Sequence, residues 1–266
     1  MARLNVGSLS FDADLVVFDK DGTLIDFEYA WGRQTVAGVE RLIAAVQSDA
    51  ALRGDVYRSL GYDPQTHRTA GTGPLATASI GRLSTIVACV LYQHGFVWDE
   101  AEAHARSSFE AGLTSIPLQE LIRPVADVKR LVNDLREADV RLAVVTTDDR
   151  SPTLETLALL GIADQVDFLA CGDDQIPLKP APDGVLNACA HLSVAPARTL
   201  VVGDTITDMQ MAKGAGAGLR AAVLSGVGTR DSLADYADIV LDSVADICVS
   251  QNHITPSRRD ITQSSS

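Results

Sequence analysis

The segment "VVFDKDGTLID" (16–26) constrains what this chain can fold into more than any other. An apolar run leads directly into Asp19 and Asp21, with Lys20 between them and Gly22 after them. Carboxylates at the end of a buried strand lose hydration unless a metal, a proton or a cation compensates them. The segment therefore predicts a strand that ends in a functional site. The alternative is a simple turn at Asp21 and Gly22.

Beyond residue 120 the sequence alternates between short apolar runs and helical patterns. Such alternation is typical of βαβ units, in which helices join parallel strands. We therefore expect an α/β fold with a mainly parallel sheet, to which residues 13–19 contribute one more strand. The other expected strands lie at 140–147, 198–204, 219–226 and 237–242, and the expected helices lie near 124–138, 151–161, 182–192 and 205–215.

Residues 27–120 have a different pattern. Apolar residues recur with helical spacing at 36–46 and at 80–90, whereas strand-like runs are scarce. We interpret this block as an all-helical insert with a Gly-, Pro- and Thr-rich loop at 61–79. The predicted organisation is a core of residues 1–26 and 121–250, a helical domain of residues 27–120 and a polar, disordered tail of residues 251–266.

Composition excludes some partners. The 266 residues carry a formal net charge of -13, whereas binding to nucleic acid or anionic lipid relies on clustered Lys and Arg. We therefore expect no nucleic acid and no membrane as a main partner. The four cysteines form no CxxC pair, which disfavours a zinc site and a disulfide framework. We see no secretory leader and no apolar run of membrane-spanning length, so we expect a cytoplasmic protein.

Two further candidates lie at the end of a later strand and in a later loop. Thr146 ends the apolar run "LAVVT", where its hydroxyl is placed to donate to a phosphate oxygen, although it can equally just terminate a strand. Lys179 lies in "LKPAP", where the prolines stiffen the backbone and can direct the ammonium group inward to neutralise a phosphate. The alternative is an exposed lysine in a loop, which is the usual case.

The segment "VVGDTITD" supplies Asp204 at the end of a strand and Asp208 in the first turn of the next helix. Together with Asp19 these carboxylates form an oxygen-ligand set for a hard cation. For Asp208 there is another explanation, because Thr205 followed by an acid three residues later fits a capping box. Both roles are compatible. Asp204 has no comparable structural explanation.

These features occur in a fixed order: strand with DxDGT, strand with Thr, Lys-Pro, strand with GDxxxD. A match in several parts is far less prone to chance than a single motif. The set resembles the haloacid dehalogenase superfamily from about residue 12 to about residue 249. Segments such as "KPAPDGVLNAC" and "VVGDTITDMQMAKGAGAG" are similar to its phosphoglycolate phosphatase-like branch.

The resemblance implies a Rossmann-like three-layer core, over which the helical insert closes as a cap in the active state. It implies that Asp19 is the nucleophile that forms an aspartyl-phosphate, and that Asp21 is the general acid and then the general base. The implied phosphate-binding residues are Thr146, Thr147 and Lys179, although Thr147 replaces the commoner Asn. The implied Mg²⁺ ligands are Asp19, Asp21 through its backbone carbonyl, Asp204, and Asp208 directly or in the second coordination sphere.

The function that the resemblance implies is a Mg²⁺-dependent phosphatase for small organic phosphomonoesters such as 2-phosphoglycolate. We expect a monomer or homodimer. A sugar phosphomutase with the same core and a non-catalytic module that binds a phosphorylated ligand remain alternatives. Dehalogenation is disfavoured by the acid at Asp21, and Schiff-base phosphonate hydrolysis is disfavoured because residues 27–120 contain no lysine.

Two expectations concern residues outside these motifs. Lys20 stands where relatives often carry an apolar residue, and we expect it to point away from the site without a catalytic role. Basic residues of the insert are candidates to meet a carboxylate or second phosphate of the substrate, although a solvated surface position is the usual one for each. These are Arg33, His67, Arg68 and Arg82.

Overall fold

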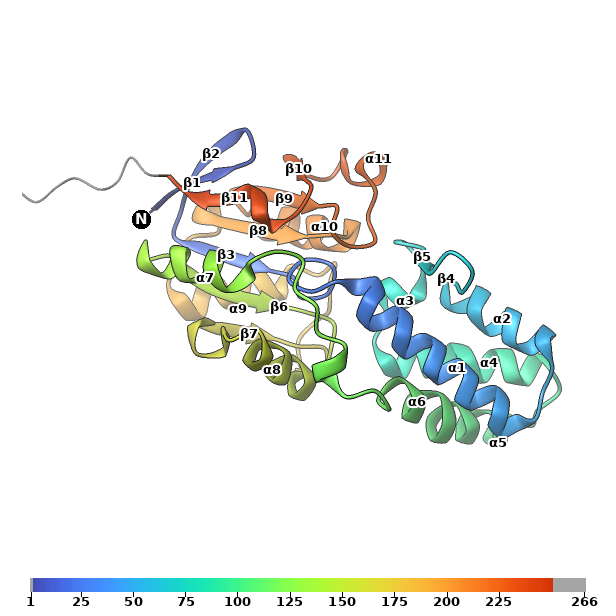
Figure 1. The fold of residues 1–266 in the computed structure, drawn as a ribbon. Coiled ribbons are helices and arrows are strands. Elements are labelled where there is room, and N and C mark those ends of the chain that lie inside the picture. Colours follow the sequence, from blue (N-terminus) through green and yellow to red (C-terminus); the bar gives the residue numbers. More distant parts are fainter. Residues whose placement is uncertain (1, 251–266) are drawn as a thin grey trace, which may run out of the picture.

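The computed structural model describes residues 2–250, which form two lobes joined near residues 26 and 121 (Figure 1). A six-stranded parallel sheet forms the centre of the larger lobe, which we call the core. The predicted α/β fold is confirmed. In spatial order its strands are β10 (Ile239–Leu241), β9 (Leu219–Val223), β8 (Thr199–Gly203), β3 (Leu15–Phe18), β6 (Arg141–Val145) and β7 (Phe168–Ala170).

The position of strand β3 inside the sheet explains why its sequence is apolar without interruption. Val16 and Phe18 pack on the face covered by α7 and α8, while Leu15 and Val17 pack on the face covered by α9 and α10. A strand buried on both faces has no position for a polar side chain until it ends. The sheet is thus the middle of three layers. The core helices are α7 (Val128–Glu137), α8 (Arg150–Leu159), α9 (Asp183–Leu192), α10 (Ile206–Ala215) and α11 (Arg230–Leu233).

The structure departs from the expected core in four places. The expected strand at 13–19 is shorter, and strand β7 was not expected at all. The helix expected from residue 124 begins only at Val128, because the Asp127 side chain accepts a hydrogen bond from the Arg130 amide and caps the helix there. A separate antiparallel sheet, also not expected, contains β11 (Ile247–Val249), β1 (Ala2–Val6) and β2 (Leu9–Ala13).

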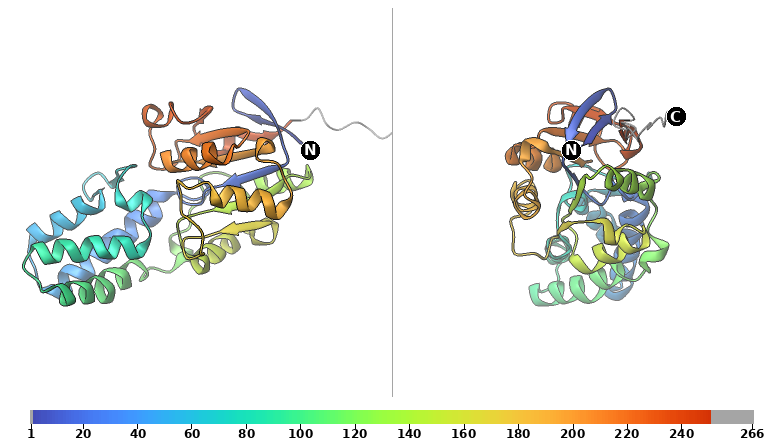
Figure 2. Two further views of the ribbon diagram at one scale, coloured as in Figure 1. Left: turned by 180° about the vertical axis from the view of Figure 1, so that it is seen from behind. Right: turned by 90° about the vertical axis from the view of Figure 1, so that its left-hand side faces the viewer.

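The smaller lobe, residues 27–120, has its own apolar core and projects from one end of the core domain (Figure 2). It is not wholly helical, because the expected loop at 61–79 contains a two-stranded ladder and a short helix that starts at Pro74. Pro fits the first position of a helix, where its missing N–H costs nothing. We call this lobe the cap; it contains α1 (Arg33–Val46), α2 (Ala50–Leu60), β4 (Tyr62–Asp63), β5 (Arg68–Thr69), α3 (Pro74–Thr77), α4 (Ile80–Gln93), α5 (Trp98–His104) and α6 (Ala111–Leu113).

Two sequence-based expectations concern other parts of the chain. The tail at 251–266 lies outside the described residues. Within the described residues, the helices are all too short or too polar to cross a membrane.

Candidate active site

The predicted site residues follow three adjacent parallel strands. Asp19 comes directly after β3, Thr146 after β6 and Asp204 after β8, and β3 lies between the other two. The carboxyl ends of parallel strands share one edge of the sheet, which is where open α/β sheets bind ligands. The sheet therefore brings Asp19 together with residues that follow it by more than a hundred positions in the sequence.

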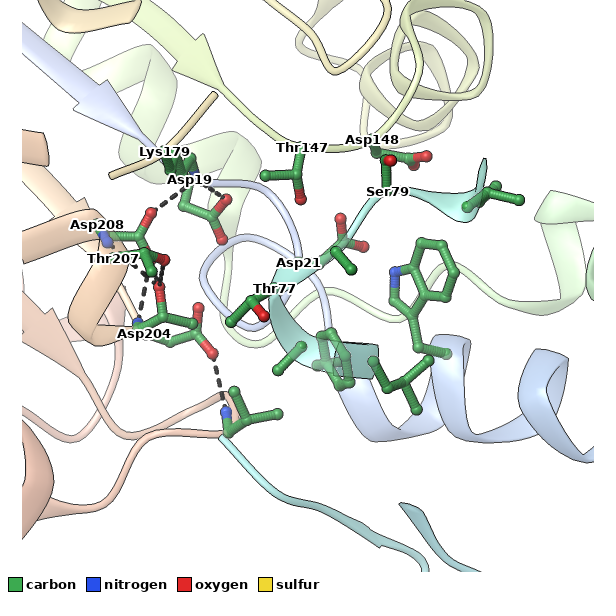
Figure 3. A pocket seen from close by; sticks show the side chains of 18 of the residues that line it. Asp19, Asp21, Thr77, Ser79, Thr147, Asp148, Lys179, Asp204, Thr207 and Asp208 are labelled. Atoms are coloured by element: carbon green, nitrogen blue, oxygen red, sulfur yellow. Dashed lines mark hydrogen bonds and ion pairs between the residues drawn. The ribbon is translucent and has the colours of Figure 1, made fainter. Parts of the chain in front are cut away.

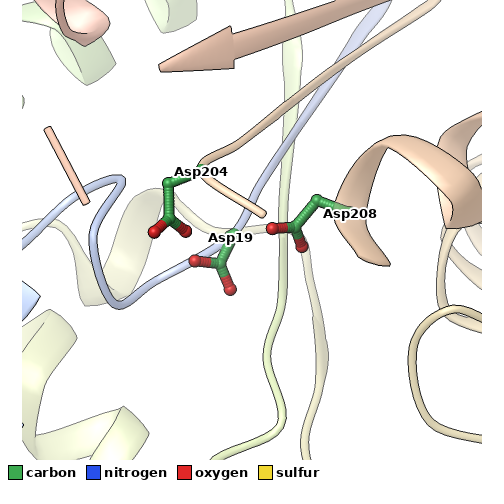
Figure 4. A group of neighbouring side chains, drawn as sticks. All are labelled: Asp19, Asp204 and Asp208. Atoms are coloured by element: carbon green, nitrogen blue, oxygen red, sulfur yellow. The ribbon is translucent and has the colours of Figure 1, made fainter. Parts of the chain in front are cut away.

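Three buried aspartates meet at this edge (Figure 4). Asp19, Asp204 and Asp208 each offer an oxygen atom within 4.8 Å of the others. One oxygen of Asp204 accepts a hydrogen bond from the Val227 amide at 2.8 Å, while its other oxygen, Oδ1, is buried and has no hydrogen-bond partner among residues 2–250. A buried carboxylate oxygen without a donor is costly unless a cation or proton binds it. The cluster therefore fits a hard divalent cation with oxygen ligands.

Lys179 lies between two of these aspartates. Its Nζ donates to Asp19 Oδ1 at 2.5 Å and to Asp208 Oδ1 at 2.7 Å. Burial lowers the pKa of Lys179, but the charges of Asp19 and Asp208 outweigh it, so that the pKa is raised and the group stays cationic. Lys179 is thus a fixed positive charge beside the predicted nucleophile, as the Lys-Pro motif suggested.

Burial and the neighbouring carboxylates raise the pKa of two of these aspartates. Burial raises the pKa of Asp19 to about 7, against the opposing effect of Lys179. Burial also raises the pKa of Asp204, and the charges of Asp19 and Asp208 add to that increase. Without a metal ion, the folded protein therefore holds protons on this cluster that an exposed aspartate releases.

Two local features hold the cluster in place. Asp208 Oδ2 accepts hydrogen bonds from the Thr205 amide and hydroxyl, so the predicted capping box is present while Oδ1 faces Lys179. Gly22 has φ of +85°, and a Cβ there would lie 2.4 Å from Asp204 Oδ2. Only glycine allows this turn of the DxDGT segment to pass so close to Asp204.

Lys20 does not point away from the site, and that expectation is wrong. Its side chain is buried, and its Nζ lies 2.8 Å from Asp21 Oδ1 and 2.7 Å from Asp21 Oδ2. It also lies 3.1 Å from Asp148 Oδ2. The Lys20 side chain is only 3% exposed, so its charge is balanced by these two carboxylates and little by water. Lys20 and Asp148 together fix the position of Asp21.

Cap and core line one small pocket of about 40 Å³ (Figure 3). Thr77 and Ser79 enter it from the cap, opposite the core carboxylates. Of the two predicted threonines, Thr147 lines the pocket, whereas Thr146 is buried one position earlier and its hydroxyl oxygen accepts a hydrogen bond from the Asp148 amide at 3.1 Å. The cap residues belong to no motif, so local sequence offered no signal for them.

The basic residues expected to meet the substrate lie elsewhere. Arg33 donates to the backbone oxygen of Glu120 at 2.6 Å and lies over the ring of Tyr29, so it joins the two segments that connect the lobes. His67 contacts the Tyr62 hydroxyl. Arg68 and Arg82 are exposed and are not part of the pocket lining.

A family model identifies the class of protein to which this fold and site belong. Residues 13–216 match the family model for haloacid dehalogenase-like hydrolases, which covers most of the chain. The chain belongs to this family, and the predicted membership of the superfamily is confirmed.

Similarity to individual proteins supports the phosphoglycolate phosphatase-like branch. The plasmid-encoded phosphoglycolate phosphatase of Cupriavidus necator is 27% identical over 216 residues, which are 79% of this chain and 81% of that protein. Validoxylamine A 7'-phosphate phosphatase of Streptomyces hygroscopicus subsp. limoneus is 27% identical over 91% of this chain and 99% of that protein. These names support the predicted enzyme class, phosphoric monoester hydrolase.

A solved structure shows the same fold. CbbY from Rhodobacter sphaeroides, crystallised in complex with phosphate, superposes with a TM-score of 0.58. The two chains are 23% identical, and the match covers 88% of this chain and 95% of that one.

Proposed function

We propose that this hydrolase is a Mg²⁺-dependent phosphatase of small organic phosphomonoesters that works through an aspartyl-phosphate. One observation carries the proposal: the partnerless oxygen of Asp204 faces a cluster in which Asp19 lies beside the cation of Lys179. The similarity to phosphoglycolate phosphatases supports hydrolysis of small organic phosphomonoesters and makes 2-phosphoglycolate the first ester to assay.

The reaction requires two steps from the residues present. In the first, an oxygen of Asp19 attacks phosphorus, the bond from phosphorus to the ester oxygen breaks, and Asp21 protonates the leaving alcohol. In the second, Asp21 takes a proton from water, which attacks phosphorus and releases Asp19 and phosphate. Lys179 and the backbone N–H groups of the DxDGT turn bind the phosphoryl oxygens, and Thr146 and Thr147 are the further proposed contacts.

The proposed metal ligands are Asp19, the backbone carbonyl of Asp21, Asp204 and Asp208. When bound, Mg²⁺ would neutralise charge on the phosphoryl group. Lys20 Nζ donates to the Asp21 carboxylate. This carboxylate is therefore not a member of the cluster of Asp19, Asp204 and Asp208.

Removal of the metal tests the proposal directly. We expect phosphate release from para-nitrophenyl phosphate in Mg²⁺ and a loss of at least about a hundredfold in EDTA, restored by excess Mg²⁺. 2-Phosphoglycolate is assayed alongside. Turnover that EDTA leaves intact would contradict the metal dependence. Conversion of one sugar phosphate isomer into another without phosphate release would instead indicate a phosphomutase, and binding without turnover would indicate a binding module.

The affinity for Mg²⁺ should increase with pH. Because burial raises the pKa of Asp19 to about 7, a proton on Asp19 competes with the metal at about pH 6 and is largely lost by about pH 8. The ionised fraction of such a group rises about tenfold over this interval, so we expect a dissociation constant about tenfold lower at the higher pH. Isothermal titration calorimetry measures it, with Asp204→Asn as the variant expected to lose the binding. An affinity independent of pH would be inconsistent with a protonated cluster.

A further inference from the structure

A second and larger cavity adjoins the catalytic pocket. It has a volume of about 540 Å³ and lies between the start of the cap, the connecting segment 114–122 and the beginning of α8. The two cavities share five lining residues, which are Asp21, Trp31, Ile80, Asp148 and Asp149. The proposed proton donor therefore faces both cavities, and a leaving group bonded to the ester oxygen can extend from the first into the second.

The size of the second cavity exceeds what glycolate needs. Sites for drug-sized molecules have volumes of about 300–1000 Å³. A two-carbon leaving group would leave most of this space to water. Trp31, which lines both cavities, offers an aromatic face on which a ring or chain of several carbons can pack.

The charge of the lining excludes an anionic leaving group. Asp21, Asp148, Asp149 and Glu155 all contribute carboxylates to the second cavity. Its cation, Lys20, is already bound by Asp21 and Asp148, just as Lys179 in the first pocket is bound by Asp19 and Asp208. Among the described residues that line either cavity there is neither arginine nor histidine. Among the described lining residues, a carboxylate on the substrate would therefore meet like charges and no unpaired cationic side chain.

The remaining polar groups of the lining are uncharged. Thr77 and Ser79 of the cap line the first pocket, and Gln34, Gln119 and Ser151 line the second. Gln119 Nε2 donates to Glu155 Oε1 at 2.9 Å, which orients this amide and leaves its oxygen as an acceptor group. Hydroxyl and amide groups around an aromatic face are the groups that bind hydroxyl-rich molecules.

We infer that the leaving group is an uncharged, hydroxyl-rich alcohol of sugar size, and that esters bearing a carboxylate, phosphoglycolate among them, are poor substrates. The inference rests on the proposed phosphatase activity and narrows its substrate class. The similarity to phosphoglycolate phosphatases supports the ester chemistry, whereas the cavities define which alcohol leaves.

Two matched pairs of esters test the inference. Sorbitol 6-phosphate and 6-phosphogluconate differ only in a terminal CH₂OH or carboxylate, and 2-hydroxyethyl phosphate and 2-phosphoglycolate differ in the same way at two carbons. We expect kcat/KM to favour the uncharged member of each pair by about 10- to 100-fold, and to favour sorbitol 6-phosphate over 2-hydroxyethyl phosphate. Equal rates, a preference for the carboxylates, or no hydrolysis of sorbitol 6-phosphate would overturn the inference.

A charge variant tests the cause of the preference. Glu155→Gln removes one lining charge, so the preference for sorbitol 6-phosphate over 6-phosphogluconate should fall about two- to threefold. Glu137→Gln, on the exposed side of α7, is the matched control and should leave the ratio unchanged. A ratio that Glu155→Gln does not alter would contradict electrostatic exclusion. Hydrolysis of para-nitrophenyl phosphate separates the two proposals: if it is absent, the phosphatase proposal fails, and if it is present with carboxylates preferred, only this inference fails.

Discussion

Replacement of Asp19 by Asn is expected to abolish turnover. An amide cannot attack phosphorus, so kcat for para-nitrophenyl phosphate should fall by at least about 10⁴-fold, as is usual when a nucleophile is removed. The assay is phosphate release in Mg²⁺ at about pH 7. Asp12→Asn is the matched control, because Asp12 lies on β2, away from the catalytic pocket, in a loose ion pair with Arg3. A variant with a tenth of the activity would exclude Asp19 as the nucleophile.

Loss of folding should not be the cause. Because burial raises the pKa of Asp19 to about 7 from 3.8, the folded state binds the proton more tightly than the unfolded state does. The contribution of this group to stability therefore falls as pH rises from about 4 to about 7, and Asn lacks this effect. Lys179 keeps Asp208 as a partner. In EDTA at about pH 8 the Asp19→Asn variant should be at least as stable as the wild type.

Of the substitutions proposed for this protein, Lys20→Met should cause the largest decrease in the free energy of unfolding. Met has a similar length and no charge, so the carboxylates of Asp21 and Asp148 would be left close together without their common cation. Removing one member of a buried ionic group costs about 3–5 kcal/mol. We expect a decrease of that size in the free energy of unfolding, measured by urea denaturation at about pH 7.

Urea denaturation is measured at about pH 7 because of the direction in which the pKa of Lys20 is shifted. Burial lowers the pKa of Lys20, but Asp21 and Asp148 raise it above its ordinary value of 10.5. A cation whose pKa is raised in the folded state contributes fully below its unfolded pKa, so at about pH 7 the whole contribution is measured.

Two controls separate the ionic group from a general effect of losing a lysine. Lys213→Met, at an exposed position of α10, should change the free energy of unfolding by less than about 0.5 kcal/mol. Adding Asp148→Asn to Lys20→Met should recover part of the loss, because it removes the repulsion between the two carboxylates. A loss below about 1 kcal/mol for Lys20→Met would show that Lys20 is not held as described.

The relation between sequence and structure differs between the core and the cap. The strands that carry Asp19, Thr146 and Asp204 were predictable, because a strand buried on both faces must be apolar until it ends. Short strands were harder to predict: β7 has three residues, too few for a periodic signal. In the cap, β4 and β5 have two residues each and are hydrogen-bonded to each other, which no local pattern indicates.

Sequence alone determined which residues lie at the carboxyl edge of the sheet. The rule that parallel strands end at one edge placed Asp19, Thr146 and Asp204 together, and the resemblance carried by the ordered motifs predicted Lys179 beside them. The capping box of Thr205 and Asp208 was also local in sequence, because both partners lie in one helical turn. These features depend on spacing along the chain and on the geometry of a single sheet.

Only the tertiary structure decided where Lys20 points and what faces the leaving group. Lys20 follows β3 and pairs with Asp148, which follows β6. The orientation of the Lys20 side chain therefore depends on the pairing of these two strands in the sheet. Thr77, Ser79 and Trp31 meet the core carboxylates only because the cap packs against that edge. Contacts between lobes follow from the packing of two separate apolar cores, and no spacing within either segment specifies them.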